Sequence, residues 1–471
     1  MVFSSVIFLF AFLPLVLSGY YLLGRKLRNT FLLLASIGFY AWGEPVFVLV
    51  MLGSILLNWG MVWFMQTRKK QSSRRLVLII SLACNLIILF VFKYLNFTIS
   101  SLNSILGRQV INQTNIALPI GISFFTFQAI SYVVDVYRGN GSLQKNPFHV
   151  ALYIAFFPQL IAGPIVRYQT VAEQLASRRE TLEGFSSGVT RFLLGLGKKS
   201  LLANTIALLA DMAFAEAGTP QLSVMHAWLG AIAYAMQIYF DFSGYSDMAI
   251  GLGAMFGFHF PENFNYPYIS CTITEFWRRW HISLSTWFRD YVYIPLGGSR
   301  ASKHRTIFNL FIVWLLTGFW HGANWTFLIW GLFYFLLLAM EKLLKIPDKK
   351  HWTVLVFCRA FTLLAVLIAW VLFRSDSIMS ALQYLKAMFT PCTLSKSDLF
   401  LMRQFGPVLL ACVICCVPIS SQLKKGIRRF FPTSGDEICG WLSFAWLALV
   451  GILSIACVVS VTYNPFIYFT F

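Results

Sequence analysis

The chain has 471 residues, of which 58% are hydrophobic and 12% are charged, against about 25% charged residues in a typical soluble domain. Its mean hydropathy of +0.70 makes a lipid bilayer the natural solvent, and no soluble domain of ordinary size, about 100 residues, fits between the apolar runs. The net charge of +19 would suggest nucleic acid in a soluble protein, but here Lys and Arg gather in short loops, so membrane lipids and not nucleic acid are the expected surroundings.

A series of apolar runs occupies most of the chain. They cover residues 3–23, 30–42, 45–65, 76–95, 117–137, 148–166, 190–215, 225–257, 306–340, 353–373, 404–421 and 437–461. A transmembrane helix needs about 20 mostly apolar residues, so we predict an all-α polytopic membrane protein with about eleven transmembrane helices plus re-entrant helices. No internal repeat or flexible linker divides the chain, and residues 1–471 are expected to form a single membrane domain.

Basic clusters between the runs predict the topology. They lie at Arg25–Arg28, Arg68–Arg75, Arg167–Lys199, Arg278–Arg305, Lys342–Lys350 and Lys424–Arg429. The positive-inside rule places them in the cytoplasm, whereas the polar, nearly uncharged loop 96–116 is expected outside. The run 148–166 then begins and ends on the cytoplasmic side, and its Pro158, Gly163 and Pro164 predict a re-entrant segment. The same count places both ends of the chain outside.

Two acidic residues interrupt the run 225–257. The sequence YFDFSGYSD places Asp241 and Asp247 on either side of Gly244, and the polar segment PENFNYPY follows at 261–268. Paired carboxylates can perform acid–base chemistry or bind substrate. They can equally cap a second half-helix or neutralise Arg278 and Arg279, and the residues alone favour this structural role.

The segment Glu275–Arg300 has the pattern of an amphipathic helix. Apolar side chains recur at steps of three and four residues, at Trp277, Trp280, Leu284, Trp287, Phe288 and Tyr291. This predicts one helix that ends at Leu296-Gly297-Gly298, with His281 in the buried stripe, where it needs a polar partner. The pattern favours a basic interfacial helix with snorkelling arginines. The alternative is a re-entrant helix that brings His281, Arg278 and Arg279 towards a reaction centre, where the arginines bind an anionic donor such as the phosphates of coenzyme A.

His321 lies in a long stretch without charged side chains. Residues 306–340 contain no Asp, Glu, Lys or Arg, and as one helix they would measure about 52 Å, against about 30 Å for the hydrocarbon core. We therefore predict a break near Gly318 and Gly322, with His321 beside it, facing the protein interior or a cavity.

The neighbours of His321 are suited to chemistry. Burial keeps an imidazole neutral, as a general base requires. Asn324 is expected to hydrogen-bond a carbonyl or hydroxyl, and Trp320 and Trp325 to supply apolar walls. The alternative is a histidine that only cross-links helices, but an ionisable group at membrane depth favours a function.

The cysteines do not predict a metal site. Cys412, Cys415 and Cys416 share one face of an apolar helix, but no further ligands follow nearby. Small residues that pack between helices are the better interpretation.

Several motifs together resemble one known family. The segments EFWRRWHISLSTWFRDYVYIPLGG and TGFWHGANWTFLIWG strongly resemble the membrane-bound O-acyltransferase family, in its alginate O-acetyltransferase-like branch. QIYFDFSGYSDMAIGLG, PENFNYPY, GISFFTFQAISYVVDVYRG, FFPQLIAGPI and the opening MVFSS are similar to the same branch. The resemblance covers essentially the whole chain and is densest at about 117–335.

The resemblance implies a fold and a reaction. It implies a ring of membrane helices, some short and tilted, around a central tunnel. It makes His321, in the WHG motif, the catalytic residue, and His281, in the RRWH motif, the second histidine of the site. No bound cofactor is implied; acetyl-coenzyme A or another acyl thioester is the expected donor substrate. An extracytoplasmic transferase of the SGNH type is the expected partner and an exported or cell-envelope polysaccharide the acceptor, at the cytoplasmic (inner) membrane.

Three other functions remain open from the sequence. The first is D-alanyl transfer to teichoic acid, a sister activity that uses the same two histidines. The second, from another class, is a transporter or flippase in which His281 and His321 relay protons. The third is a non-catalytic scaffold for a polysaccharide exporter.

Overall fold

The computed structural model describes residues 1–344, 352–390, 395–460, 463–465 and 467, and all of the regular structure in these ranges is helical. The chain divides into two compact units. Unit 1 comprises Met1–Val189 with Met248–Pro261, and unit 2 comprises Thr190–Asp247 with Glu262–Phe471. The prediction of one domain over 1–471 stays a prediction.

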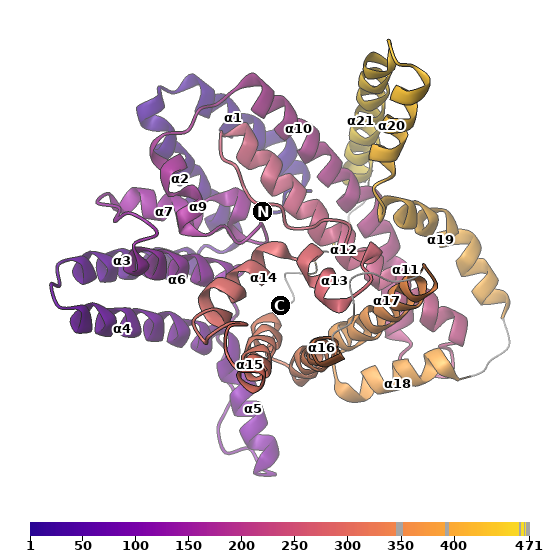
Figure 1. Cartoon of the computed structure of the whole chain (residues 1–471), viewed down its shortest axis with the longest axis horizontal. Coiled ribbons are helices and arrows are strands. Elements are labelled where there is room, and N and C mark those ends of the chain that lie inside the picture. The colour runs from indigo at the N-terminus through magenta and orange to yellow at the C-terminus, as the bar shows by residue number, and fades with distance from the viewer. Residues whose placement is uncertain (345–351, 391–394, 461–462, 466, 468–471) are drawn as a thin grey trace. The chain divides into compact units, whose positions relative to one another are not determined.

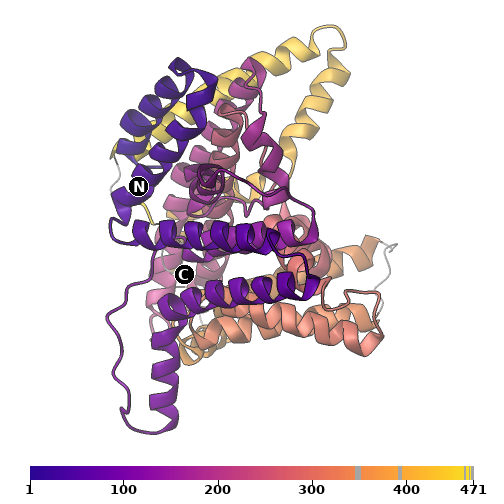
Figure 2. The same cartoon turned by 90° about the vertical axis from the view of Figure 1, so that its left-hand side faces the viewer.

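The helices of unit 1 lie mostly in the first 176 residues. They are η1 (Phe8–Phe12), α1 (Leu13–Leu22), α2 (Arg25–Gly43), α3 (Phe47–Gln66), α4 (Gln71–Leu89), η2 (Phe90–Tyr94), α5 (Leu95–Ile105), α6 (Ile122–Arg138), α7 (Pro147–Ala155), α8 (Phe157–Leu160) and α9 (Tyr168–Ala176). Helices α3, α4 and α6 pack against one another (Figures 1 and 2). A reciprocal amide pair joins α3 to α4: Asn58 Nδ2 donates to Asn85 Oδ1 over 3.0 Å, and Asn85 Nδ2 donates to Asn58 Oδ1 over 2.7 Å.

Two helices are divided between the units, α10 (Leu182–Gly197) and α12 (Val224–Met255). The remaining helices of unit 2 are η3 (Lys198–Ala203), α11 (Asn204–Ala215), η4 (Pro267–Ile269), α13 (Ile273–Arg279), α14 (Ile282–Phe288), η5 (Arg289–Tyr293), α15 (Lys303–His321), α16 (Trp325–Leu344), α17 (Trp352–Arg374), α18 (Ile378–Phe389), α19 (Lys396–Cys415), α20 (Ile419–Phe430) and α21 (Gly435–Ser460). A core rich in Trp, Tyr and Phe lies between α11, α12, α13, α16 and α17.

Seven helices of the described residues are long and apolar enough to cross a membrane. They are Phe47–Gln66, Gln71–Leu106, Leu182–Ala215, Trp325–Leu344, Trp352–Arg374, Lys396–Cys415 and Gly435–Ser460. The chain is therefore an all-α, multi-pass membrane protein. The predicted number of about eleven is not confirmed, because other apolar runs form shorter or more polar helices, such as Phe8–Leu22 and Ile122–Arg138.

Two predicted breaks are confirmed. The run 306–340 is split into α15 and α16, with Gly322 directly after the last residue of α15. The run 148–166 forms α7 and α8, separated at Phe156, and a Cβ on Gly163 would lie 2.5 Å from the Gln159 Cα. At about 1.5 Å per residue neither short helix can cross a bilayer. Their re-entrant placement and the predicted sidedness of the loops stay predictions.

The prediction of one helix from Glu275 to Leu296 is wrong. The chain forms α13 and α14, with His281 between them in the left-handed region at φ 42° and ψ 54°. The reason is a neighbouring segment that takes the backbone groups a continuous helix would use. Asn265 N donates to Arg279 O, and Ile282 N donates to Asn263 O, each over 2.9 Å. The predicted stripe is nevertheless buried at Trp277, Trp280, Leu284, Trp287 and Phe288.

Candidate functional site

His321 is the last residue of α15 and lies in an aromatic cage within unit 2. Its side chain is buried, with the residue 4% exposed. Its ring makes edge contacts with Trp320 and Trp330, each at 4.9 Å between centroids, and with Phe373 of α17 at 5.2 Å. The sequence predicted the burial of His321 and the wall formed by Trp320, but not Trp330 or Phe373.

Small residues allow α15 and α16 to form this cage. A Cβ on Gly318 would lie 2.5 Å from Phe327 O, and one on Gly331 would lie 2.5 Å from Trp314 O. At Gly322 a Cβ would lie 2.1 Å from a ring atom of Phe327. The two backbones can approach this closely only because these three positions carry no side chain. The close approach brings Trp330 of α16 over the ring of His321.

His281 is another buried histidine of unit 2. It is 0% exposed, and its ring contacts Phe242 of α12 edge-on at 4.6 Å between centroids. Its Nδ1 lies 3.1 Å from Asn263 Oδ1. Its Nε2 is buried and has no hydrogen-bond partner among the residues that the structure describes. Burial lowers the pKa of His281 to about 3, so the ring is neutral near pH 7.

Trp320 connects the two histidines. Its ring centroid lies 4.9 Å from that of His321 and 6.2 Å from that of His281. The sequence left open a re-entrant helix that would bring His281 towards a reaction centre, and in the structure both histidine rings lie against one tryptophan. This pair of buried imidazoles forms the candidate active site.

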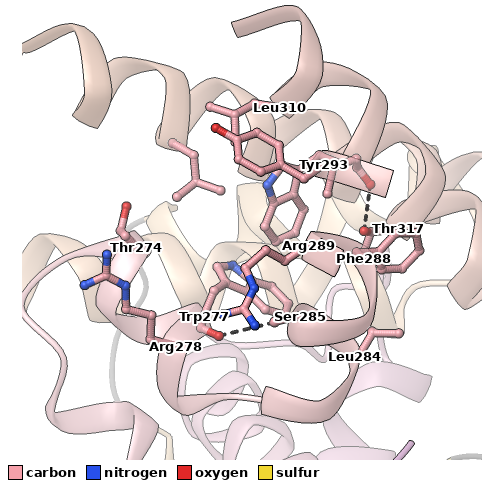
Figure 3. A pocket seen from close by; sticks show the side chains of 13 residues that line it. Thr274, Trp277, Arg278, Leu284, Ser285, Phe288, Arg289, Tyr293, Leu310 and Thr317 are labelled. Atoms are coloured by element: carbon pink, nitrogen blue, oxygen red, sulfur yellow. Dashed lines mark hydrogen bonds between the residues drawn. The ribbon is translucent and has the colours of Figure 1, made fainter. Parts of the chain in front are cut away.

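A pocket lies between α13, α14, η5 and α15 (Figure 3). Its volume is about 210 Å³. It is lined by Thr274, Trp277, Arg278, Leu284, Ser285, Phe288, Arg289, Tyr293, Leu310, Val313, Trp314, Thr317 and Leu338. Thr317 precedes His321 by four residues and therefore lies on the same face of α15. The ring of Trp277 lies 5.7 Å from that of Trp330, which contacts His321.

The pocket combines cationic, hydroxyl and aromatic side chains. Arg278 and Arg289 supply guanidinium groups, and the Arg289 side chain also pairs with Asp290 over 2.8 Å. In Figure 3 Arg289 lies beside Trp277, whose carbonyl accepts a hydrogen bond from Ser285 Oγ, and the guanidinium of Arg278 lies near Thr274. This set of groups suits a ligand that carries phosphate on an extended apolar or amide-containing arm.

The other predicted residues have different surroundings. Arg279 pairs with Glu275 over 3.0 Å and donates to Asn265 O over 3.1 Å. Trp280 packs into the aromatic core, 4.8 Å from Trp370. Asn324 Nδ2 donates to Asp376 O, and its Oδ1 accepts from Thr326 N at the start of α16. Trp325 is 52% exposed. The apolar wall beside His321 that was expected from Trp325 is formed by Trp330.

The two acidic residues form ion pairs with basic residues of α10 and η3 and not with Arg278 or Arg279. Asp241 pairs with Lys199 over 2.7 Å, and Asp247 pairs with Lys198 over 2.6 Å and Arg191 over 2.8 Å. These pairs support a structural role for both carboxylates. Their assignment to substrate binding stays a prediction.

Three side chains around His281 were missed. Asn263, Ser283 and Ser246 are buried and form a hydrogen-bonded group behind the ring. The sequence showed Asn263 only as part of the polar segment PENFNYPY. A buried histidine in an apolar stripe signals that a partner exists, but it does not identify the partner.

Known proteins resemble the chain over its full length. A family model described as membrane-bound O-acyltransferase matches residues 142–346, which include both histidines. A probable alginate O-acetylase of Pseudomonas putida is 43% identical, and the match covers 100% of each chain. A probable alginate O-acetylase of Pseudomonas aeruginosa is 47% identical over 92% of this chain and 82% of the relative.

More distant relatives bear other names. A peptidoglycan O-acetyltransferase of Helicobacter pylori is 33% identical, over 100% of this chain and 98% of the relative. A teichoic acid D-alanyltransferase of Bacillus subtilis is 32% identical over 50% of this chain and 62% of the relative. From the full-length similarity and the family model together, the chain belongs to the membrane-bound O-acyltransferase family and is an O-acyltransferase.

Proposed function

We propose that the protein moves acetyl groups from a cytoplasmic thioester across the inner membrane for O-acetylation of an exported or cell-surface polysaccharide. The observation that carries this proposal is the buried pair of histidines against Trp320, in a chain similar over its full length to proteins named as O-acetylases. Two relatives named for D-alanyl transfer match 50% and 65% of the chain, against 100% for the probable alginate O-acetylase of Pseudomonas putida, which favours acetyl transfer. Membership of an acyltransferase family favours an enzyme over a transporter.

His321 is proposed as the general base. Neutral imidazole accepts the proton of an acceptor hydroxyl, and the hydroxyl oxygen attacks the carbonyl carbon of the thioester. The C–O bond forms, the C–S bond breaks, and the leaving thiolate takes the proton back from the imidazolium. The aromatic cage of Trp320, Trp330 and Phe373 excludes water, which would otherwise hydrolyse the thioester.

The pocket of Figure 3 is proposed as the site of the acyl donor, with acetyl-coenzyme A as its expected occupant. Arg278 and Arg289 would bind phosphate groups of the donor. Both belong to the basic cluster at 278–305, which is predicted to lie on the cytoplasmic side. The thioester arm would extend past Trp277 and Thr317 towards His321. Thr317 and His321 are four residues apart, which is about 6 Å along the axis of α15. An extracytoplasmic transferase of the SGNH type is proposed as the partner that delivers the acetyl group to the polysaccharide.

The test measures base-labile acetyl esters on the surface polysaccharide of cells that carry His321→Ala in place of the native chain. We expect ester content to fall to the level of the gene deletion, because general-base catalysis typically contributes about 10²- to 10⁴-fold. His304→Ala is the matched control, since His304 is exposed near the start of the same helix. Full ester content at a normal membrane level of the His321→Ala protein would contradict the proposal.

A second variant of the same experiment examines the donor site. In inverted membrane vesicles, Arg278→Ala is expected to leave the maximal rate of acetyl transfer largely intact. It should raise the acetyl-coenzyme A concentration that gives half of the maximal rate, because Arg278 is proposed to bind the donor and takes no part in the reaction. Lys303→Ala, an exposed change in α15, serves as the charge-matched control. An unchanged concentration dependence would exclude Arg278 from donor binding.

A further inference from the structure

The side-chain amide of Asn263, next to His281, forms hydrogen bonds through both its oxygen and its nitrogen. It is 1% exposed. Its Oδ1 accepts hydrogen bonds from Ser283 N over 3.2 Å and from Ser283 Oγ over 2.9 Å, and it lies 3.1 Å from His281 Nδ1. Its Nδ2 donates to Ser246 Oγ over 2.9 Å. The amide is therefore fixed between α12 and the start of α14.

This arrangement determines which way the amide points. A backbone N–H can only donate, so the atom that faces Ser283 N must be the amide oxygen. The same oxygen faces His281 Nδ1 and can only accept from it. Ser283 Oγ also lies 3.5 Å from Nδ1, but it donates its hydrogen to the nearer Asn263 Oδ1 over 2.9 Å, so Nδ1 carries a proton. Because complete burial disfavours the doubly protonated ring, Nε2 carries none and presents a lone pair.

The lone pair on Nε2 lies in an apolar surrounding. The ring packs edge-on against Phe242 and faces Trp320, and Nε2 has no hydrogen-bond partner among the residues in the described ranges. A buried acceptor without a donor destabilises the protein. Such an atom, next to the Trp320 that also contacts His321, indicates the place of a hydrogen-bond donor that arrives with the substrate.

We propose that Asn263 is a positioning residue that fixes His281 in the Nδ1–H form, so that Nε2 accepts a hydrogen bond from an O–H or N–H group of the substrate. This inference rests on the proposed function for the nature of that substrate. It also assigns a polarity: His281 cannot donate from Nε2 to the carbonyl oxygen of the thioester, so it does not stabilise the oxyanion of the addition step. The donor hydrogen comes either from the acceptor hydroxyl or from an amide N–H of the thioester arm.

The protonation of the ring can be measured without any reaction. Full-length protein in lipid, labelled with ¹⁵N in its histidine rings, is compared with His281→Gln to identify the two His281 signals. We expect a protonated Nδ1 and an unprotonated Nε2 near pH 7. Asn263→Leu should shift His281 towards the Nε2–H form, whereas Asn265→Leu, an exposed change two residues away, should leave the signals unchanged. A protonated Nε2 in the unaltered protein would overturn the proposal.

Asn263→Asp separates positioning from simple support of the fold. The carboxylate still accepts from Nδ1 and Ser283 N, so the Nδ1–H form should persist. Its negative charge stabilises the imidazolium and raises the pKa of His281, so a larger fraction of rings is protonated at a given low pH. The acid limb of the pH–rate profile should therefore move to higher pH, with activity near neutral pH well above that of Asn263→Leu. Equal loss in both variants with an unmoved acid limb would contradict positioning.

Acetyl-coenzyme A alone distinguishes the two sources of the hydrogen. A change in the Nε2 signal upon its addition identifies the amide of the donor arm. A signal that changes only when a hydroxyl acceptor such as an alginate oligosaccharide is also present identifies the acceptor. An Nε2 signal that responds to neither would overturn contact with the substrate. The ring signals do not depend on turnover. If the protein proved not to transfer acetyl groups, the assignment of the proton to Nδ1 would therefore still stand.

Discussion

At the scale of single residues, the backbone at His281 is the least expected feature of the site. His281 and Tyr266 are the two non-glycine residues with positive φ among those that the structure describes, and a left-handed conformation costs about 1–2 kcal/mol for an ordinary residue. The segment that contains Tyr266 also contains Asn263, so both strained residues belong to the paired stretches around the histidine. Strain of this kind persists where the surrounding structure enforces it, often at functional sites.

The thermal stability of variants at position 281 should depend on how well the new residue tolerates positive φ, and not on its hydrophobicity. The position is fully buried, so burial alone favours valine. We expect His281→Asn to retain the higher midpoint of thermal unfolding, because asparagine tolerates positive φ and a β-branched residue does not. Thermal unfolding of the two purified variants in one detergent decides this. A higher midpoint for His281→Val would show that the left-handed conformation relaxes at little cost.

At the scale of helices, a buried ion pair joins η3 to α12. Lys199 and Asp241 are each 2% exposed at the side chain. Lys199 Nζ also donates to Pro465 O, and Asp241 Oδ2 accepts from Ile467 N over 3.0 Å. The pair therefore holds part of the C-terminal segment against unit 2's own helices. Removal of one charge leaves the other without compensation in an apolar surrounding.

A double substitution separates the structural from the substrate-binding role of Asp241. Lys199→Met alone should destabilise the protein by about 3–5 kcal/mol. Lys199→Met combined with Asp241→Leu should recover most of that loss, because no unpaired charge remains. Stability is followed by thermal unfolding and function by surface acetyl esters. Recovery of both would confirm a structural role, whereas a stable double variant without acetyl transfer would indicate that Asp241 acts on the substrate.

At the scale of the whole molecule, the sidedness of the loops sets where donor and acceptor enter. The continuous helix Gln71–Leu106 has 36 residues, or about 54 Å at 1.5 Å per residue. It exceeds the hydrocarbon core of about 30 Å. Its C-terminal part, α5, forms a projecting hairpin with residues 106–121 of unit 1 (Figure 2). The basic cluster at Arg68–Arg75 lies at its N-terminal end, which predicts a cytoplasmic start and an external end.

Cysteine labelling in intact cells tests this topology. The nine native cysteines are first replaced, and Arg108→Cys or Lys70→Cys is then introduced at an exposed position. A membrane-impermeant maleimide should label Arg108→Cys in intact cells and Lys70→Cys only after permeabilisation. Labelling of both positions in intact cells would invalidate the positive-inside assignment for this helix.

The amino-acid sequence by itself determined the membrane class, the break beside His321 and the burial of the tryptophan stripe around His281. These features follow from local composition and periodicity: a charge-free run too long for one span must break, and glycines mark where it can. Only the tertiary structure decided that the stripe is divided between two helices. The backbone groups that interrupt the helix belong to Asn263 and Asn265, which lie outside the stripe and do not affect its periodicity. The same holds for Trp330 over His321, for Lys199 opposite Asp241, and for the hydrogen bond that fixes the ring of His281. Residue types disclose that a buried polar group needs a partner, and the packing of distant segments decides which partner it has.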